Sequence, residues 1–332
     1  MNLISASSGR FEENGSTFKI VGANNYYMAF TTPAMRAAVI EAAKQIGLNV
    51  LRSPAFLDSP WRGAYFQSWN PATNRPEINT AENGLQRLDH LIADAEQSGL
   101  RLILPLVNHW PDFGGMDRYV SWFGAATRDD FYRDLRIREA YKSYASQILN
   151  RENTVTGRVY KDEPSILAWE LANEPRCANG AVLIEWVEEM SRWIKQNDPN
   201  HLLAVGDEGY RTKQFLAVPE IDFGTFHLYP ETSRQRNPVR SITEHLTAGR
   251  NAGKPMLLEE YGITSKSNRN HIYTEWLRAI EQQDGAGDLA WMLASTDDET
   301  GEPYPDHDGF TFYSAAEVPS ICEHALQMTT AS

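Results

Sequence analysis

The stretch "ILAWELANEP", residues 166–175, closes an apolar run with the polar side chains of Asn173 and Glu174. A second stretch, "PMLLEEYG" at 255–262, ends in the same way on a pair of glutamates. Apolar runs of this length, bounded by proline or glycine, are typical of strands buried on both faces. Because a core strand has no structural need for a carboxylate at its end, both stretches indicate strands that deliver acidic side chains to a site.

Runs of this kind recur along the whole chain, and each is followed by an amphipathic stretch of helical length. The predicted strands lie at 18–28, 49–56, 100–108, 166–175, 202–209, 222–230, 255–262 and 287–295. The predicted helices lie near 32–46, 83–98, 128–149, 180–196, 211–218, 239–252, 268–283 and 315–328. In the second helix, Leu85, Leu88 and Leu91 recur at a spacing of three, which is the stripe of a helix that covers a sheet.

Strict alternation of strands and helices predicts a parallel sheet. Eight units in this length favour a closed (β/α)8 barrel, the TIM barrel of the α/β class, over an open doubly wound sheet. No dinucleotide-binding fingerprint follows the first strand, which argues further against the open sheet. Since no linker-like segment divides the chain, we expect residues 1–332 to form one catalytic domain.

Composition narrows the class of partner. The chain has 332 residues, 42% of them hydrophobic, a net charge of −13 and a pI near 5.1. Its basic residues are scattered, so nucleic acid and anionic membranes are disfavoured as partners, and no apolar stretch is long enough to span a bilayer. A neutral ligand and a monomer are expected. The start lacks the features of a signal peptide, which indicates either a secreted protein whose leader lies outside this numbering or a cytoplasmic one.

Two features exclude several classes of site. The only cysteines, Cys177 and Cys322, rule out a disulfide scaffold or a cysteine metal cluster and leave open whether they pair. The sequence also lacks a G-x-S-x-G elbow, a P-loop and an H-E-x-x-H helix. The adjacent Asp306, His307 and Asp308 are typical of a turn rather than of metal ligands. We therefore expect neither a metal nor a cofactor.

Three long segments follow predicted strands and should border the site: 57–81, 109–127 and 295–314. They contain aromatic residues that could stack on sugar rings or could only pack their own loops. These are Trp61, Tyr65, Trp69, Trp110, Trp122 and Tyr304.

The strand-end carboxylates suggest a chemistry. Two carboxyl groups that face each other across a cleft are the working parts of glycoside hydrolysis. One is kept neutral and protonates the leaving oxygen, while the other attacks the sugar or activates water. Other strand ends are polar as well, namely Arg52, Asn108, His227 and Tyr229, with Trp291 in the eighth strand. Their shared position favours a site over a structural explanation.

Seven stretches, in order, resemble the retaining glycoside hydrolases of family 5, in the clan of (β/α)8 barrels, and most closely its endo-β-1,4-mannanases. They are "GANNYYM", "LRSPAF", "LVNHWPDFGGMDRYVSWFG", "WELANEPRC", "FHLYPE", "KPMLLEEYG" and "YPDHDGFTFY", which cover about residues 18 to 313. The resemblance implies a retaining enzyme that cleaves internal bonds of mannan, glucomannan or galactomannan. Manno-oligosaccharides would be its smaller partners.

The resemblance also assigns roles. Glu174 matches the general acid/base, and Glu260, directly before an aromatic residue and glycine, matches the nucleophile. Glu259 competes with Glu260, but strand alternation lets only one of two neighbours face the site. Glu170 is expected inside the barrel in a hydrogen-bond network.

Further roles follow from the same resemblance. Asn173 would hold the 2-hydroxyl of the sugar, and Arg52 would keep Glu260 ionised. Tyr229 would bond the nucleophile, and His227 would line the region of the acid. Trp291 would form the floor under the sugar. Asn108 and Trp110 complete the predicted substrate-binding set, and His109 departs from the family pattern.

Three alternatives remain open from the sequence alone. The same scaffold supports an exo-acting β-mannosidase or an endo-β-1,4-glucanase, and loop shape would separate these from an endo-mannanase. An inactive carbohydrate-binding protein would be expected to lack one of the two glutamates, and both are present.

Overall fold

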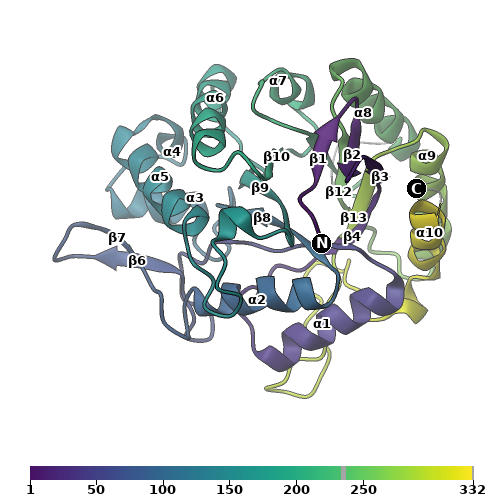
Figure 1. The fold of residues 1–332 in the computed structure, drawn as a ribbon, viewed down its shortest axis with the longest axis horizontal. Helices are drawn as coiled ribbons and strands as arrows, with labels where there is room; N and C mark the ends of the chain where they lie inside the picture. Colours follow the sequence, from purple (N-terminus) through teal and green to yellow (C-terminus); the bar gives the residue numbers. More distant parts are fainter. Residues whose placement is uncertain (233–236, 331–332) are drawn as a thin grey trace.

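Eight parallel strands form a nearly closed barrel in the computed structural model, which describes residues 1–232 and 237–330 (Figure 1). The strands are β4 (Ile20–Asn24), β5 (Val50–Arg52), β8 (Arg101–Pro105), β9 (Ile166–Asn173), β10 (Leu202–Gly206), β11 (Gly224–Leu228), β12 (Met256–Tyr261) and β13 (Gly287–Ala290). Each lies inside one of the eight predicted runs. The predicted TIM barrel is confirmed.

Helices surround the barrel, as the alternating pattern predicted (Figure 1). They are α1 (Pro33–Ile46), α2 (Gln86–Gln97), α5 (Leu135–Leu149), α6 (Gly180–Asn197), α7 (Thr212–Leu216), α8 (Pro238–Ala252), α9 (Arg269–Gln282) and α10 (Pro319–Thr330), with the shorter α3 (Gly115–Trp122) and α4 (Asp130–Arg133). No helix of the described residues combines the length and apolarity that a bilayer span requires.

Helix α1 shows how the sequence sets these elements. The Thr32 side chain accepts a hydrogen bond from the Met35 amide, and Pro33 occupies the first turn, where its missing N–H costs nothing. Gly47 ends the helix at φ 91°, a left-handed conformation that glycine adopts without strain. Between these caps, Met35, Val39 and related residues bury one face against the barrel.

Neighbouring strands of the barrel are paired by backbone hydrogen bonds except β10 and β11, which lie at the two ends of the strand order. Side chains bridge this seam. The Thr225 hydroxyl donates to the Val205 carbonyl at 2.7 Å and accepts from the Asp207 amide at 2.8 Å. The Asp222 carboxylate accepts from the Leu203 amide at 2.7 Å, and the Asp222 amide donates to the Leu203 carbonyl at 2.8 Å. These bonds replace the missing strand ladder.

The opposite end of the barrel from the site is closed by a small sheet that the sequence prediction missed. It consists of β1 (Ser5–Ser7), β2 (Arg10–Glu13) and β3 (Ser16–Phe18). Ile4 and Phe11 from this segment pack on the first residues of the barrel strands, and the Phe11 ring meets that of Phe223 edge-on at 5.2 Å. Strands of three or four residues are too short to show the periodicity on which the prediction relied.

Two of the long loops contain structure that was not predicted. Segment 57–81 forms a hairpin of β6 (Gln67–Asn70) and β7 (Arg75–Ile78), and segment 109–127 contains α3. The rings of Trp69 and Trp122 stack at 6.5 Å between these two loops. The hairpin and α3 thus fix each other beside the carboxyl ends of the barrel strands. Cys177 and Cys322 are both free.

Candidate active site

A cleft of about 940 Å³ opens at the carboxyl ends of the strands, which is where active sites of this fold are built. Its lining includes all nine residues that the sequence predicted for the site: Arg52, Asn108, Trp110, Asn173, Glu174, His227, Tyr229, Glu260 and Trp291. The fold therefore brings together residues from strands that are far apart in the sequence.

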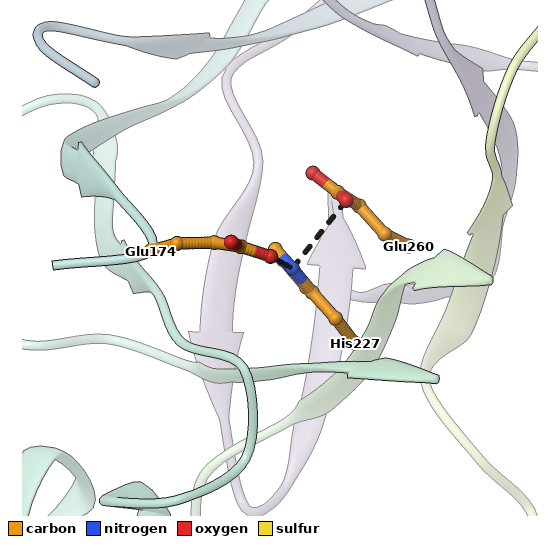
Figure 2. A group of neighbouring side chains, drawn as sticks. All are labelled: Glu174, His227 and Glu260. Atoms are coloured by element: carbon orange, nitrogen blue, oxygen red, sulfur yellow. Dashed lines mark hydrogen bonds and ion pairs between the residues drawn. The ribbon is translucent and has the colours of Figure 1, made fainter. Parts of the chain in front are cut away.

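Glu174 and Glu260 face each other across the cleft, with His227 beside both (Figure 2). One carboxylate oxygen of each glutamate and one imidazole nitrogen all lie within 4.8 Å of one another. Retaining glycosidases hold their two carboxyl groups about 5 to 5.5 Å apart, whereas inverting enzymes need about 6.5 to 9.5 Å to admit a water. The arrangement fits the retaining geometry.

Glu260 lies between Arg52 and Tyr229. Its Oε1 accepts from Arg52 Nη1 at 2.6 Å, and its Oε2 accepts from the Tyr229 hydroxyl at 2.8 Å. Burial raises the pKa of Glu260 above its ordinary value, although the charges of His227 and Arg52 oppose this rise. Arg52 thus lies where the sequence placed it, directly against the proposed nucleophile.

Glu174 follows β9 in a left-handed conformation with φ 47°, which is uncommon for a residue with a side chain. This turn sends its carboxylate back into the cleft. Oε2 accepts from Trp110 Nε1 at 2.7 Å, and Oε1 lies 2.6 Å from His227 Nδ1. Burial alone would raise the pKa of Glu174, but the bonds from His227 and Trp110 outweigh it and hold the pKa below its usual range.

The order of the two pKa values differs from the expectation that the acid, Glu174, is the neutral carboxyl group. The pKa of Glu174 is lowered and that of Glu260 is raised. Two carboxyl groups this close titrate as a pair, so a proton bound at the site can be carried by either of them. Arg52 and His227 are the positive partners of the two glutamates and already contact their carboxylate oxygens. The cluster is therefore arranged for acid–base chemistry rather than for binding a metal cation.

Asn173 links the two halves of the site. Its Oδ1 accepts from Arg52 Nη2 at 2.7 Å, and its Nδ2 donates to Asn108 Oδ1 at 3.0 Å. These two bonds orient the amide at the end of β9, next to Glu174. Asn108 in turn accepts from the Trp110 amide at 3.2 Å, which connects the network to the loop after β8.

Two further carboxyl groups lie fully buried beneath the site. Glu170 accepts from Arg52 Nη2 at 2.8 Å, so it occupies the network inside the barrel that the sequence predicted. Glu259 is also inaccessible and points away from the cleft, with Oε2 3.2 Å from His227 Nε2. The alternation argument that chose Glu260 over Glu259 for the cleft is confirmed in its geometry.

The loops contribute the aromatic walls. Trp61, Trp110 and Tyr304 line the cleft, whereas Tyr65, Trp69 and Trp122 do not, so half of the predicted aromatic residues belong to the site. Trp291 lies in the cleft and donates Nε1–H to Asp308 at 2.7 Å.

The segment around Asp306 is a turn, as predicted. Asp306 accepts from the amides of Gly309 and Thr311 and pairs with Lys266 at 2.6 Å. Asp308 caps the amide of Phe310 in the same turn.

The sequence prediction missed several residues of the cleft, among them Tyr26, Arg176 and Glu208. Arg176 lies over the Trp110 ring, 4.6 Å from its centroid, and its Nε is 2.7 Å from Glu208. A signal existed, because Arg176 directly follows the Asn-Glu-Pro motif and Glu208 closely follows β10. His109, which departs from the family pattern, is buried behind Trp110 and meets Arg128 through Nε2 at 3.1 Å.

Comparisons with known proteins agree with this geometry. Residues 1–277 match the family model described as GH family 5 beta-mannosidase-like. The mannan endo-1,4-beta-mannosidase A of Podospora anserina is 36% identical over 338 residues, covering 94% of this chain and 87% of that protein. The endo-1,4-beta-mannanase structure from Rhizomucor miehei matches with a TM-score of 0.90 and 34% identity over 99% of this chain and 100% of that one. The endo-beta-1,4-mannanase structure from Thermotoga petrophila gives a TM-score of 0.84 and 40% identity, over 96% and 79%.

Proposed function

The chain belongs to glycoside hydrolase family 5, and from this premise we propose that it is an endo-1,4-β-mannanase in which Glu174 is the acid/base and Glu260 the nucleophile. Its substrate is β-1,4-linked mannan, as a linear or mixed polymer or as manno-oligosaccharides. The observation that carries the assignment of roles is the contact of Arg52 Nη1 with Glu260 at 2.6 Å, opposite the contact of His227 and Trp110 with Glu174.

In the first half of the reaction, Glu260 attacks the anomeric carbon and Glu174 gives its proton to the departing glycosidic oxygen. Arg52 and the Tyr229 hydroxyl stabilise the ionised form of Glu260, against the burial that raises its pKa. The proton that the pair shares is then carried by Glu174, on the side where Trp110 and Arg176 receive the leaving sugar.

In the second half, Glu174 is ionised and takes a proton from the water that attacks the covalent intermediate, which frees Glu260. The bonds from His227 Nδ1 and Trp110 Nε1 stabilise this carboxylate form. The same contacts that lower the pKa of Glu174 therefore serve this step.

Asn173 is held between Arg52 and Asn108 with its amide at the edge of the cleft, where it can bond the 2-hydroxyl of the sugar. Such a bond strengthens as the ring flattens toward the oxocarbenium-like transition state. Trp291, fixed by Asp308, provides an apolar face for the same sugar. These two contacts position the ring between the two carboxyl groups.

The experiment that tests this function is the product profile of the purified protein on linear mannan, with carboxymethyl cellulose as a parallel substrate. We expect a series of manno-oligosaccharides and a rapid fall in viscosity on mannan. Mannose alone, with viscosity nearly unchanged, would show an exo-acting enzyme. Activity confined to the cellulose substrate would show a glucanase on the same barrel.

A further inference from the structure

His227 lies between two carboxylates that approach opposite sides of its ring. Nδ1 is 2.6 Å from Glu174 Oε1, and Nε2 is 3.2 Å from Glu259 Oε2. The ring is 3% exposed, so water does not compete for either nitrogen. A neutral imidazole carries one N–H and could donate to only one of these oxygens, whereas an imidazolium donates to both.

Glu259 has no role in the two reaction steps described above. It is fully buried on the strand that carries Glu260, and its Oε2 is 3.5 Å from Arg52 Nη2. Its Oε1 meets no N–H or hydroxyl donor within the part of the chain that the structure describes. The carboxyl group of Glu170, also fully buried, lies within hydrogen-bond reach of Glu259.

Two carboxyl groups in hydrogen-bond contact need a proton between them. Burial raises the pKa of Glu170 well above its ordinary value; the charge of Arg52 opposes this rise, and the contact with Glu259 adds to it. The charges of Arg52 and His227 lower the pKa of Glu259 despite its burial. These opposite shifts favour the proton on Glu170 and the negative charge on Glu259, which lies under the ring of His227.

The charges of the whole group are consistent with this assignment. Glu170, Glu174, Glu259 and Glu260 face only two cationic side chains, Arg52 and His227, among the ion pairs of the described residues. When one proton is bound by Glu170 and Glu259 and another by Glu174 and Glu260, two negative charges meet two positive ones. A buried cluster is favoured in such a neutral state, because each unbalanced charge carries a desolvation cost.

Building on the proposed function, we propose that Glu259 is a positioning residue for the acid/base. Through Nε2 it holds His227 as an imidazolium that donates Nδ1–H to Glu174, while Glu170 keeps the proton that leaves Glu259 ionised. Glu259 thereby sets the pH range in which Glu174 works, without touching substrate.

Other charged groups face His227 as well, from different elements. Glu260 Oε2 is 3.4 Å from Nδ1 and approaches the ring from the cleft side. Asp207, after β10, is buried and interacts electrostatically with the ring, and Arg52 reaches the site through Glu259 and Glu260. Glu259 is the partner of Nε2, so its charge decides whether both ring nitrogens keep their protons.

The test is the pH profile of kcat/KM for Glu259→Gln on linear mannan. Loss of the imidazolium removes the positive charge next to Glu174, so the pKa of Glu174 rises. The basic limb of the profile should move upward by roughly one pH unit. For an aryl mannoside with an activated leaving group, the acidic limb of kcat should move in the same direction, because hydrolysis of the intermediate needs ionised Glu174.

Two matched variants separate this role from a structural one. Glu170→Gln keeps a neutral donor beside Glu259, so its profile should stay within about 0.3 pH unit of wild type, on the scale of ordinary pKa shifts. Glu163→Gln removes the charge of another buried carboxylate, before β9 and away from the cleft, and should leave the profile unchanged. A Glu259→Gln profile that coincides with wild type would overturn the proposal, and so would an equal shift in Glu170→Gln.

A measurement on the wild-type protein keeps the proposal testable if the variants fold poorly. Nitrogen-15 shifts of the His227 ring, assigned with His227→Gln, should show two protonated nitrogens at pH 7. A neutral ring at pH 7 would refute the proposal. If the wild type fails to hydrolyse mannan, the proposed function falls instead, and the state of the ring still reports on Glu259.

Discussion

The catalytic end of the barrel and the layer of helices around it both bury charged side chains. They differ in the number of buried carboxyl groups for each basic side chain. In the helical layer, Asp89 has Arg151 at 2.5 Å and Asp198 has His201 at 2.7 Å. His324 sits 2.7 Å from Asp288, where it joins α10 to β13. Each fully buried carboxylate of these pairs has a basic side chain against it. At the catalytic end, four carboxyl groups share Arg52 and His227.

The two arrangements have different physical consequences. A buried acid with its own cation has one favoured state and locks two elements together. Acids that outnumber their cations must share protons, and their pKa values spread apart, as those of Glu170 and Glu259 do. Such a cluster provides proton transfer at some cost in stability.

The largest effect is expected for Glu260→Gln, because it removes the nucleophile of both half-reactions. We expect kcat/KM to fall by at least ~10⁴-fold on mannan and on an aryl mannoside alike. Steady-state kinetics with both substrates measure this. If Glu260→Gln retained most of its activity while Glu259→Gln lost it, the two adjacent glutamates would have been assigned the wrong way round.

Glu174→Gln should produce a smaller and more selective loss. On mannan the leaving group needs a proton, so we expect a decrease of about 10² to 10⁴-fold. On an aryl mannoside with an activated leaving group, the first step should survive and appear as a burst of the aryl product. Stopped-flow absorbance detects that burst. Equal losses on both substrates, without a burst, would contradict the acid/base role.

In the helical layer, His324→Gln should reduce stability and spare activity. It leaves Asp288 buried without its cation, which costs about 3 kcal/mol in the free energy of unfolding. Contacts with Asp288 and Glu281 raise the pKa of His324 to about 9 despite its burial. Because this pKa is higher than in the unfolded chain, the stabilisation is complete below about pH 6.5 and is lost as the pH rises through about 9.

Urea unfolding of wild type and His324→Gln at pH 6, 8 and 10 measures this prediction, with kcat/KM at 25 °C as the control. The gap between the two proteins should narrow between pH 8 and 10. A gap that is the same at all three values would show that packing, and not charge, is what His324 contributes.

The smallest effect is expected at Asp58, a buried acid whose Oδ1 accepts from Gln67 at 2.7 Å. Burial raises the pKa of Asp58 to about 7, so the folded protein binds a proton between about pH 4 and pH 7 that the unfolded chain does not. Stability therefore falls as the pH rises through that window. Asp58→Asn cannot ionise, so it should be about 1 to 2 kcal/mol more stable than wild type at pH 8.

Unfolding midpoints at pH 4.5 and pH 8 test the sign of this effect. The advantage of Asp58→Asn should be present at pH 8 and largely absent at pH 4.5, where the wild-type carboxyl group is protonated as well. A variant that is less stable at both values would mean that the fold stabilises the ionised carboxylate and lowers the pKa of Asp58 instead of raising it.

The sequence predicted the repeated strands and helices and the polar residues at the ends of the strands. Eight apolar runs specified the barrel, and polar residues at the run ends, such as Arg52 and Tyr229, specified the cleft. The Asn14-Gly15 turn of the small sheet was a hairpin signal, but the strands beside it are too short for periodicity to support it. The pairing of Trp69 with Trp122 joins two loops whose conformations no local pattern determines.

The features of the site that the sequence could not predict also depend on the folded structure. Strand alternation placed Glu259 away from the cleft but said nothing of its contact with His227, because that contact depends on the register shift between β11 and β12. Likewise, the order of the pKa values of Glu174 and Glu260 depends on distances to His227 and Arg52 that only the folded barrel defines.

The left-handed backbone at Glu174 has a consequence for directed evolution. Glycine adopts φ near 47° without strain, whereas a glutamate there costs of order 1 kcal/mol or more. A library selected for heat resistance alone should therefore enrich glycine or asparagine at position 174 and yield sturdy, inactive proteins. Selection for mannan degradation should reject both glycine and asparagine at position 174. The residue found at this position therefore reports whether a screen selects for stability or for activity.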